Sequence, residues 1–373
     1  MKSKLAALCT YMKGKVAVDT LDEYTYISTE NMIPNKGGIE RASSLPSTQY
    51  TQAFDLGDVL VSNIRPYFKK IWMAEYSGGC SNDVLVFRAS KGCDPTFLYY
   101  VLANNSFFDY ATATSKGTKM PRGDKTAIMQ YEVPAFDIAT QQRIGRLLKG
   151  IDTRIVTNKK INDNLQQQAA ALFSSLYDRS NTEVRFTDLI QILGGGTPKT
   201  GENTYWNGNI AFFTPKDVGI PYTLITEKTI SKEGLSHCNS RLYPVNTVFV
   251  TARGTVGKVG MSGVPMAMNQ SCYALVGKET HQLLVYFYTL KAVDRLKHKA
   301  SGAVFDAITT RDFESEQIMK LSDDDATAFL RVAEPMFQEV LNNNIENLRL
   351  STLRDSLLPK LMSGEIDVSA VQL

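Results

Sequence analysis

Basic and amide side chains that follow apolar runs are the residues with the clearest capacity for chemistry. Arg253 and Gly254 follow the apolar run 248–251, and Arg65 follows the similar run 59–61 in the first half of the chain. Guanidinium and ammonium groups bind phosphates, and amides of Asn and Gln pair with adenine edges. We therefore expect such positions to contact nucleic acid, although a solvated surface charge is the alternative for each Lys and Arg. The candidate residues are Arg65, Lys69, Lys70, Ser81, Asn82, Lys116, Thr118, Lys119, Arg122, Lys125, Thr197, Lys199, Lys216, Arg253, Thr255, Lys258, Asn269, Gln270 and Arg311.

Motifs for catalysis are missing from the sequence. It contains no NPPY or DPPY tetrapeptide, and the stretch 194–200 (GGGTPKT) lacks the glycine that precedes lysine in a phosphate-binding loop. Val259 stands where the stretch 254–258 would need Ser or Thr for magnesium. The three histidines form no HExxH motif, and His237 beside Cys238 lacks a second ligand pair. We expect no catalytic residue, no metal and no cofactor.

Composition is typical of a globular protein with more than one domain. The chain has 373 residues, of which 43% are hydrophobic and 21% charged, and the net charge of +3 permits nucleic-acid binding without demanding it. No apolar run is long enough for a membrane span. The short apolar start, followed at once by Lys13-Gly14-Lys15, is interpreted as structure and not as a signal peptide. Five scattered cysteines without a CxxC pair favour a reducing compartment, so we expect a cytoplasmic protein.

An internal duplication, offset by about half the chain, is the most informative feature of the sequence. Four segments of the first half resemble segments of the second half in the same order and at nearly constant spacing: 58–65 and 247–253, 70–73 and 258–261, 81–87 and 269–275, and 97–102 and 285–290. The pair Lys116-Gly117 before Asp124 also echoes 301–302 before Asp312. Each half therefore contains one copy of the same domain.

The elements expected in the two copies also match. The β-branched runs 59–61, 84–87, 248–251 and 273–276 are expected to be strands. The segments 95–110 and 281–296, which are rich in Phe, Tyr and Leu, are expected to be helices. Each copy is thus a mixed α/β domain of roughly 130 residues, a common domain size.

Each half ends in a long heptad pattern. In the first half the two interleaved sets are Leu148, Ile155, Asn162, Ala169, Leu176 and Ile144, Ile151, Asn158, Leu165, Leu172. In the second half they are Phe329, Met336, Asn343, Leu350, Leu357 and Ala333, Val340, Asn347, Arg354, Leu361. We expect the two helices to pair as an antiparallel coiled coil; the alternative is that each packs on its own domain.

Polar and proline residues add detail to these helices. Asn158, Asn162, Asn343 and Asn347 hold matching places on the two seams and are expected to fix the register. Pro335 is expected near a first turn, and Pro359 is expected to kink or end its helix. A helix of about 36 residues spans roughly 54 Å, which exceeds one DNA turn of about 34 Å.

Several motifs together resemble the specificity (S) subunits of type I restriction–modification systems. The opening of the second copy carries Thr187-Asp188-Leu189, the GGTP stretch 195–198 and Tyr205-Trp206, and the residues 253–258 and 268–270 continue the pattern. Further matches are Val133-Pro134 before 141–144, and the C-terminal stretch 357–366. The resemblance covers nearly the whole chain, but the first copy lacks the GGTP and YW elements.

The resemblance implies an α+β fold with two target recognition domains separated by two long helices. The expected bounds are 1–138 for the first recognition domain, 139–179 for the first helix, 180–323 for the second domain, and 324–373 for the second helix and tail. Each domain would read half of a split site in double-stranded DNA. The helices would fix the gap and bind methyltransferase (modification) subunits, and a motor-nuclease (restriction) subunit would complete the enzyme. The methyl donor, ATP and magnesium would belong to these partners.

Two other classes of function remain as alternatives. A coiled-coil assembly scaffold would use the helices without reading DNA sequence. A stand-alone enzyme fragment would need activity without a partner, which the missing motifs disfavour. A homodimeric reader of a single sequence is disfavoured because the two copies have diverged, so an asymmetric site is expected.

Overall fold

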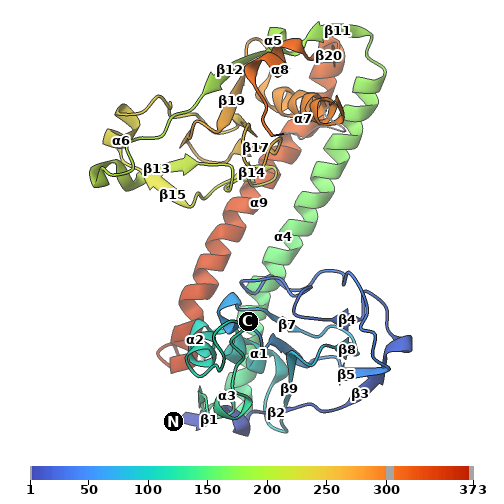
Figure 1. The fold of residues 1–373 in the computed structure, drawn as a ribbon, viewed down its shortest axis with the longest axis vertical. Coiled ribbons are helices and arrows are strands. Elements are labelled where there is room, and N and C mark those ends of the chain that lie inside the picture. The colour runs from blue at the N-terminus through green and yellow to red at the C-terminus, as the bar shows by residue number, and fades with distance from the viewer. Residues whose placement is uncertain (1, 300–305, 369–373) are drawn as a thin grey trace. The chain divides into compact units, whose positions relative to one another are not determined.

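The structure of the chain is a computed structural model that describes residues 2–299 and 306–368. The chain divides into two compact units (Figure 1). Unit 1 comprises Met1–Ile155 and Arg349–Leu373, and unit 2 comprises Val156–Leu348. Within the described ranges, no helix is both long and apolar enough to cross a membrane.

Unit 1 contains two four-stranded sheets and a short pair of strands. The first sheet is antiparallel and has the order β2 (Cys9–Tyr11), β9 (Val84–Ala89), β6 (Val59–Ser62), β7 (Ile71–Met73). The second sheet has the order β3 (Lys15–Ala17), β5 (Tyr50–Phe54), β8 (Gly78–Cys80), β4 (Tyr26–Ile27). Strands β1 (Lys2–Lys4) and β10 (Glu132–Pro134) pair separately. The expected strands at 59–61 and 84–87 are thereby confirmed.

The first sheet of unit 1 is buried on both faces because its side chains alternate between two cores. Val59 and Phe87 belong to the core that also contains residues of helix α1 (Pro95–Ala103) and helix α2 (Asn105–Ala113). Leu60 and Val86 belong to the core on the opposite face, which also contains Trp72. Short helices complete the unit: η1 (Leu5–Ala7), η2 (Val18–Thr20), η3 (Pro66–Phe68) and α3 (Lys125–Ile128).

The single helix expected over 95–110 is wrong, because the segment forms two helices. Asn104 interrupts it with extended backbone angles (φ −65°, ψ 138°), and its side chain accepts a hydrogen bond from the amide of Ser106. An N-cap asparagine replaces the hydrogen bond that a helical backbone would make, so α2 begins anew after Asn104. Asp94 caps α1 in the same way, ahead of Pro95.

Unit 2 repeats the central strand order of unit 1. Its larger sheet has the order β12 (Ile190–Gly194), β19 (Cys272–Gly277), β16 (Val248–Thr251), β17 (Val259–Ser262), β14 (Tyr222–Thr223). A smaller sheet has the order β15 (Lys228–Ile230), β13 (Trp206–Phe213), β18 (Met266–Met268), and β11 (Thr182–Arg185) pairs with β20 (Gln317–Lys320). The register confirms the duplication, since Val59 lies opposite Phe87 and Val248 lies opposite Leu275.

A long helix of unit 2 packs on its larger sheet. Helix α7 (Gln282–Lys299) packs on β17 and β19, as Figure 1 shows, and includes residues 282–296 of the segment 281–296 that is expected to be helical. The remaining helices of this unit are η4 (Asn203–Tyr205), α5 (Phe186–Leu189), α6 (Lys232–Ser236) and α8 (Thr310–Ser315). The expected echo of Lys116-Gly117 at 301–302 lies outside the described residues.

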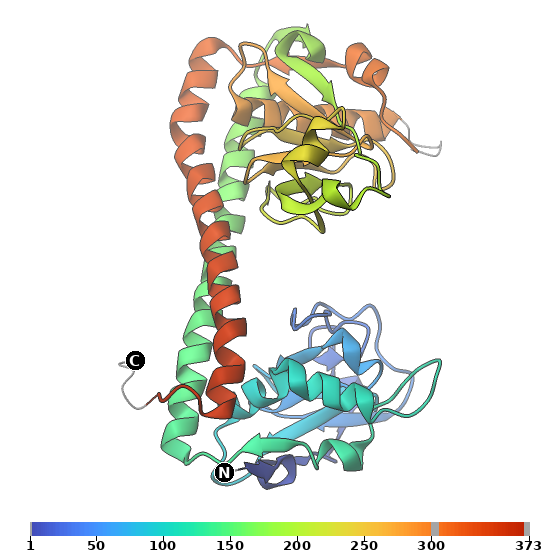
Figure 2. The ribbon, with the colours of Figure 1, turned by 90° about the vertical axis from the view of Figure 1, so that its left-hand side faces the viewer.

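Two long helices, α4 (Ile138–Asp178) and α9 (Asp323–Ser363), contribute to both units, and each has 41 residues. In unit 1, Ile144 and Leu148 of α4 share a core with Leu361 of α9. In unit 2, Phe173 of α4 packs against Phe329 of α9. Within each unit the two helices therefore lie side by side (Figure 2). One predicted heptad set is buried throughout: Leu148, Ile155, Asn162, Ala169 and Leu176.

The four asparagines expected on the seams meet across the helices of unit 2. Asn158 Nδ2 donates to Asn347 Oδ1 over 3.0 Å, and Asn343 Nδ2 donates to Asn162 Oδ1 over 2.9 Å. The residue number falls along α9 as it rises along α4, so the two segments run in opposite directions. Burial of Asn162 and Asn343 makes this hydrogen bond depend on one register, because an unpaired amide in a buried seam is costly.

Pro335 of α9 does not lie near a first turn, and Pro359 does not end the helix. The helix begins at Asp323, so Pro335 is inside it and not in the first turn, and it continues past Pro359 to Ser363. Both proline side chains are exposed. A proline removes one backbone hydrogen bond, and on an exposed face water can hydrogen-bond to the freed carbonyl.

Candidate nucleic-acid interface

In unit 1 the turn between β6 and β7 carries three of the predicted residues. Arg65 and Lys69 flank η3, and both have left-handed backbone angles (φ 50° and 52°). The amide of Arg65 donates to the carbonyl of Pro121 over 2.8 Å, and the amide of Gly123 donates to the carbonyl of Asn63 over 3.1 Å. These bonds hold the basic loop 116–122 beside the β6–β7 turn. The structure thus brings together two segments that are about fifty residues apart in the chain.

The backbones of Lys116 and Arg122 form an isolated antiparallel β-bridge that closes the basic loop. Arg122 pairs with Asp83 over 3.1 Å, and Lys116 pairs with Asp124 over 2.5 Å. The hydrogen bond from Lys116 lowers the pKa of the Asp124 carboxyl. The tip of the loop, which contains Thr118 and Lys119, is exposed. The charge offered to a ligand therefore comes mainly from this tip, since the two residues at the base of the loop already face carboxylates.

Three predicted cations of the β6–β7 turn differ in how much they are engaged within the protein. Lys70 Nζ donates to the carbonyl of Thr29 over 2.6 Å, and Lys69 Nζ donates to Asn105 Oδ1 over 3.0 Å. The Arg65 Nε atom is buried and has no hydrogen-bond acceptor among the residues that the structure describes. Asn63 Oδ1 is also buried, and no described residue donates a hydrogen bond to it. An unsatisfied buried donor and acceptor at one turn are unusual in folded proteins. Arg65 therefore keeps an unused hydrogen-bond donor at this turn, whereas the Lys70 ammonium is already engaged within the protein.

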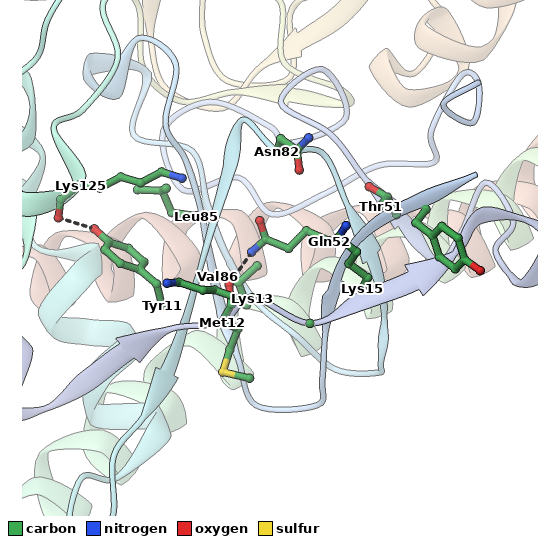
Figure 3. Close-up of a pocket in the computed structure, with 12 residues that line it drawn as sticks. Tyr11, Met12, Lys13, Lys15, Thr51, Gln52, Asn82, Leu85, Val86 and Lys125 are labelled. Atoms are coloured by element: carbon green, nitrogen blue, oxygen red, sulfur yellow. Dashed lines mark hydrogen bonds between the residues drawn. The ribbon is translucent and has the colours of Figure 1, made fainter. Parts of the chain in front are cut away.

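A hollow beside β2 contains basic residues that the sequence analysis did not select. Lys13 and Lys15, which flank Gly14, line a cavity of about 320 Å³ together with the predicted residues Asn82 and Lys125 (Figure 3). The tripeptide Lys13-Gly14-Lys15 was treated only as evidence against a signal peptide. The feature of the sequence that could have pointed to a binding site is the glycine between two lysines. The pairing of distant strands brings this tripeptide next to Asn82.

In unit 2 the turn between β16 and β17 presents the predicted residues Arg253, Thr255 and Lys258, and all three are exposed. Gly254 and Gly257 supply the left-handed angles of this turn (φ 84° and 74°). Thr255 Oγ1 donates to the carbonyl of Pro215 over 3.2 Å, which places the turn beside the predicted Lys216. Lys216 is largely exposed and lies 3.9 Å from Glu227, a distance at which a surface ion pair contributes little.

The segment before α8 lies next to the same turn. Arg253 and Ala307 form an isolated antiparallel β-bridge, and the amide of Ile308 donates to the carbonyl of Ala252 over 2.9 Å. This matches unit 1, where Ile64 bridges Arg122 at the corresponding strand end. Arg311 follows in α8 and is exposed. Residues 300–305 of the predicted counterpart loop lie outside the described part of the chain.

The GGTP stretch of unit 2 packs against the turn that holds Asn269 and Gln270. The amide of Gly196 donates to the carbonyl of Met268 over 3.1 Å, and Thr197 Oγ1 donates to Gln270 Oε1. A Cβ atom on Gly195 would lie 2.3 Å from the carbonyl oxygen of Asn269, so only glycine permits this approach. Three predicted residues, Thr197, Asn269 and Gln270, therefore meet at one surface. Lys199 is exposed nearby, and its carbonyl accepts a hydrogen bond from Trp206 Nε1.

The aromatic pair Tyr205 and Trp206 packs within the protein. The Tyr205 ring stacks on His237 at 4.9 Å, and the Trp206 ring lies edge-on to Phe212 at 5.5 Å. These contacts favour packing of the two rings within the protein over stacking of the rings on a DNA duplex. His237 is thus used in a ring contact, and no group of metal-ligating side chains is found among residues 2–299 and 306–368.

The chain thus contains two copies of one mixed sheet-and-helix domain, with cations and amides at the strand ends. The family model of the type I restriction modification DNA specificity domain matches the chain twice, over residues 4–167 and 179–320. The chain therefore belongs to this family of type I restriction–modification specificity proteins.

Individual relatives agree with this assignment. The type I restriction enzyme HindI specificity subunit of Haemophilus influenzae is 24% identical over 432 aligned residues, which cover 91% of this chain and 94% of the relative. The EcoR124I/EcoR124II specificity subunit of Escherichia coli is 28% identical over 164 residues, covering 42% of this chain and 40% of the relative. The crystal structure of an S subunit from M. genitalium has the same fold, with a TM-score of 0.65 at 16% identity, covering 97% of this chain and 96% of that one.

Proposed function

We propose that this chain is a DNA-sequence specificity subunit that reads a split, asymmetric site in double-stranded DNA. One observation carries the proposal: each unit presents the same strand-end surface with different side chains. Arg65, Asn82 and the loop 116–122 form it in unit 1, and Arg253, Gln270 and Thr197 form it in unit 2. Side chains that differ between equivalent surfaces would read different bases, so the two half-sites would differ.

The long helices α4 and α9 would form an antiparallel coiled coil that sets the gap between the half-sites. Hydrogen bonds between Asn158 and Asn347 and between Asn162 and Asn343 support this proposal, because polar seam residues specify a single register. The recognition domains would span residues 1–138 and 180–323, and the helical parts 139–179 and 324–373. Exposed faces of the helices would bind methyltransferase subunits, and a motor-nuclease subunit would complete the restriction complex.

In this scheme the chain selects the site, and its partners perform methyl transfer and cleavage. The curated relatives are specificity subunits, which agrees with this division of labour. The candidate residues of this chain are cations, amides and hydroxyls, which bind phosphates and base edges.

The experiment that tests the proposal is a map of methylated adenines in DNA modified by the complex of this chain with its modification subunits. We expect one split motif with two unequal halves. A continuous motif would contradict the split site, and methylation without sequence preference would favour the alternative of an assembly scaffold.

Arg253 tests the assignment of individual residues. Arg253→Ala should cost about 1–3 kcal/mol at one base position if the guanidinium reads a base. Binding measurements on a panel of duplexes with single base changes would show this position. Equal weakening on every duplex, with a smaller salt dependence, would instead identify Arg253 as a phosphate contact.

A further inference from the structure

The hollow of unit 1 occupies the place that the GGTP stretch occupies in unit 2. Tyr11 lies opposite Phe87 in β9, and Ile192 lies opposite Leu275 in β19. Phe87 and Leu275 are equivalent because each also lies opposite the first residue of the neighbouring strand, β6 or β16. Counting forward from this register places Lys13, Gly14 and Lys15 where unit 2 has Gly194, Gly195 and Gly196.

The turn opposite this segment is equivalent in the two units as well. The same register makes Asn82 the counterpart of Gln270, because each residue stands five positions before the equivalent residue Phe87 or Leu275. In unit 2, Gln270 contacts Thr197 of the GGTP stretch, whereas in unit 1 Asn82 lines an open hollow with Lys13 and Lys15. The two units therefore use one site of the fold with different chemistry, neutral in unit 2 and cationic in unit 1.

The charge in the hollow is unbalanced. Lys13, Lys15 and Lys125 line it, and no Asp or Glu is among its lining residues (Figure 3). All three lysines are exposed, and the described part of the chain provides no ion pair for them. Three exposed lysines without a carboxylate among the lining residues favour binding of an anion, and lysine binds phosphate as a point charge.

The walls of the hollow are fixed by hydrogen bonds before any ligand arrives. Tyr11 Oη donates to the carbonyl of Lys125 over 3.1 Å, and Gln52 Nε2 donates to the carbonyl of Met12 over 3.2 Å. The amide of Ala53 donates to the carbonyl of Gly14 over 2.8 Å. Backbone segments from β2, β5 and α3 are thus held together, which reduces the entropy lost on binding.

We propose that this hollow binds a backbone phosphate of the DNA, with Lys13 and Lys15 as sequence-independent anchors beside the reading surface of unit 1. The inference rests on the proposed function and deepens it, because it assigns phosphate binding to one half of the site. Unit 2 has glycines at the equivalent positions, so the salt dependence contributed by this site belongs to the unit 1 half alone.

The test is DNA binding by the full chain assembled with its modification subunits, measured at a series of potassium chloride concentrations. The double variant Lys13→Ala/Lys15→Ala should weaken binding by the same factor on specific and non-specific duplexes. The slope of the logarithm of the binding constant against the logarithm of salt should fall by about one per lysine removed. The charge-retaining variant Lys13→Arg/Lys15→Arg should keep most of the slope.

Lys91→Ala is the matched control for the single variant Lys13→Ala. Lys91 is also exposed in unit 1, but it lies beyond the opposite end of β9 and outside the hollow. If Lys13→Ala changes the slope no more than Lys91→Ala does, the phosphate site is refuted even if the wild-type complex prefers one split site. If the double variant loses discrimination at one base pair, the hollow reads a base and the phosphate assignment is wrong. A wild-type complex that binds DNA without sequence preference would refute the proposed function, while the predicted change in slope would still support the anion site.

A separate arm distinguishes DNA phosphate from free phosphate. Inorganic phosphate should compete with DNA for the wild-type complex more strongly than chloride of equal ionic strength does, and the double variant should lose this difference. Phosphate competition together with unchanged DNA affinity of the double variant would show a small-anion site and overturn the DNA assignment.

Discussion

The central strands of the two units follow the same order, β2-β9-β6-β7 and β12-β19-β16-β17, whereas the turns that join them differ. The β6–β7 turn places Arg65 and Lys69 in left-handed conformations (φ 50° and 52°), and the β16–β17 turn uses Gly254 and Gly257 (φ 84° and 74°). Left-handed angles are costly for residues with a Cβ atom and cost little for glycine. Unit 1 thus accepts backbone strain and has a cation at each left-handed position, whereas unit 2 has glycine at both positions and its cations, Arg253 and Lys258, at other positions of the turn.

The same contrast appears at the start of the buried strands. Asp58 precedes β6, its carboxylate is only 2% exposed, and it accepts hydrogen bonds from Arg88 Nε and Nη2 over 2.7 and 2.6 Å. Thr247 holds the equivalent place before β16 and donates to the carbonyl of Pro244 over 2.8 Å. One fold therefore tolerates an ion pair or a neutral hydroxyl at the same position, provided that each buried polar group has a partner.

The largest expected effect is on this pair of positions. Asp58→Ala should lower the free energy of unfolding of unit 1 by about 2–3 kcal/mol, because it removes the buried carboxylate that accepts two hydrogen bonds from Arg88 and leaves this partly buried guanidinium with the exposed carboxylate of Asp55. Thr247→Ala should cost unit 2 about 1 kcal/mol, since only one neutral hydrogen bond is lost.

Each unit contains one of the two tryptophans, Trp72 or Trp206, so urea denaturation can be followed separately. Trp206→Phe leaves fluorescence from unit 1, and Trp72→Phe leaves fluorescence from unit 2. Equal losses of unfolding free energy for Asp58→Ala and Thr247→Ala would contradict the contrast between the ion pair that precedes β6 and the neutral hydroxyl that precedes β16.

The helix pair gives the next largest effect, because its polar contacts also differ between the units. In unit 1, Arg354 Nη1 pairs with Asp152 over 2.7 Å, and the Tyr100 hydroxyl donates to the same carboxylate. In unit 2, Asn343 donates to Asn162 in a buried seam. Asn343→Ala should destabilise unit 2 by about 1–3 kcal/mol, because Asn162 Oδ1 loses the donor Asn343 Nδ2 in the buried seam, while Asn162 Nδ2 keeps its bond to Asn344.

The double variant Asn162→Leu/Asn343→Leu separates stability from register. It should be less destabilised than Asn343→Ala, or more stable than the wild type, since both polar groups are removed together. Denaturation followed by Trp206 fluorescence would measure this. A double variant that is less stable than Asn343→Ala would show that the asparagines contribute net stability and do not act mainly on register.

The third comparison concerns the two turns, and the smallest effect is expected at Lys69. Gly257→Ala should lower the stability of unit 2 by about 1–2 kcal/mol, because its φ of 74° suits glycine and a Cβ atom would meet the side chain of Lys297. Lys69→Gly should raise the stability of unit 1 by roughly 0.5 kcal/mol, since relief of a strained φ outweighs the lost hydrogen bond to Asn105. Thermal unfolding of both variants would compare them, and a Lys69→Gly variant that is less stable than the wild type would remove the strain argument.

Much of the fold was predictable because burial leaves a periodic record in the sequence. Strands at 59–61, 84–87, 248–251 and 273–276 appeared where apolar β-branched runs predicted them. The heptad positions Leu148, Ile155 and Ala169 are buried in α4 for the same reason. The break at Asn104 was missed because a capping asparagine within an apolar run has a local signal weaker than the run itself.

The candidate surfaces were only partly predictable. The residues of the β6–β7 and β16–β17 turns were selected from their neighbours in the chain, whereas Lys13 and Lys15 were not selected. Likewise, the sequence did not show that Lys70 bonds to Thr29, or that Thr197 meets Gln270. Contacts of this kind depend on strand pairing between distant segments, which neighbouring residues do not encode.

Two copies of one α/β domain, each followed by a long helix, can be recognised from the residues alone, because repeats, strand runs and heptads are local patterns that burial imposes. Which cations remain available to a ligand depends on how the chain folds. That outcome depends on the register of β2 with β9 and of β12 with β19, which sets Lys13-Gly14-Lys15 and Gly194 to Gly196 at the same site. A pairing shifted by one residue would turn these side chains to the other face of the sheet.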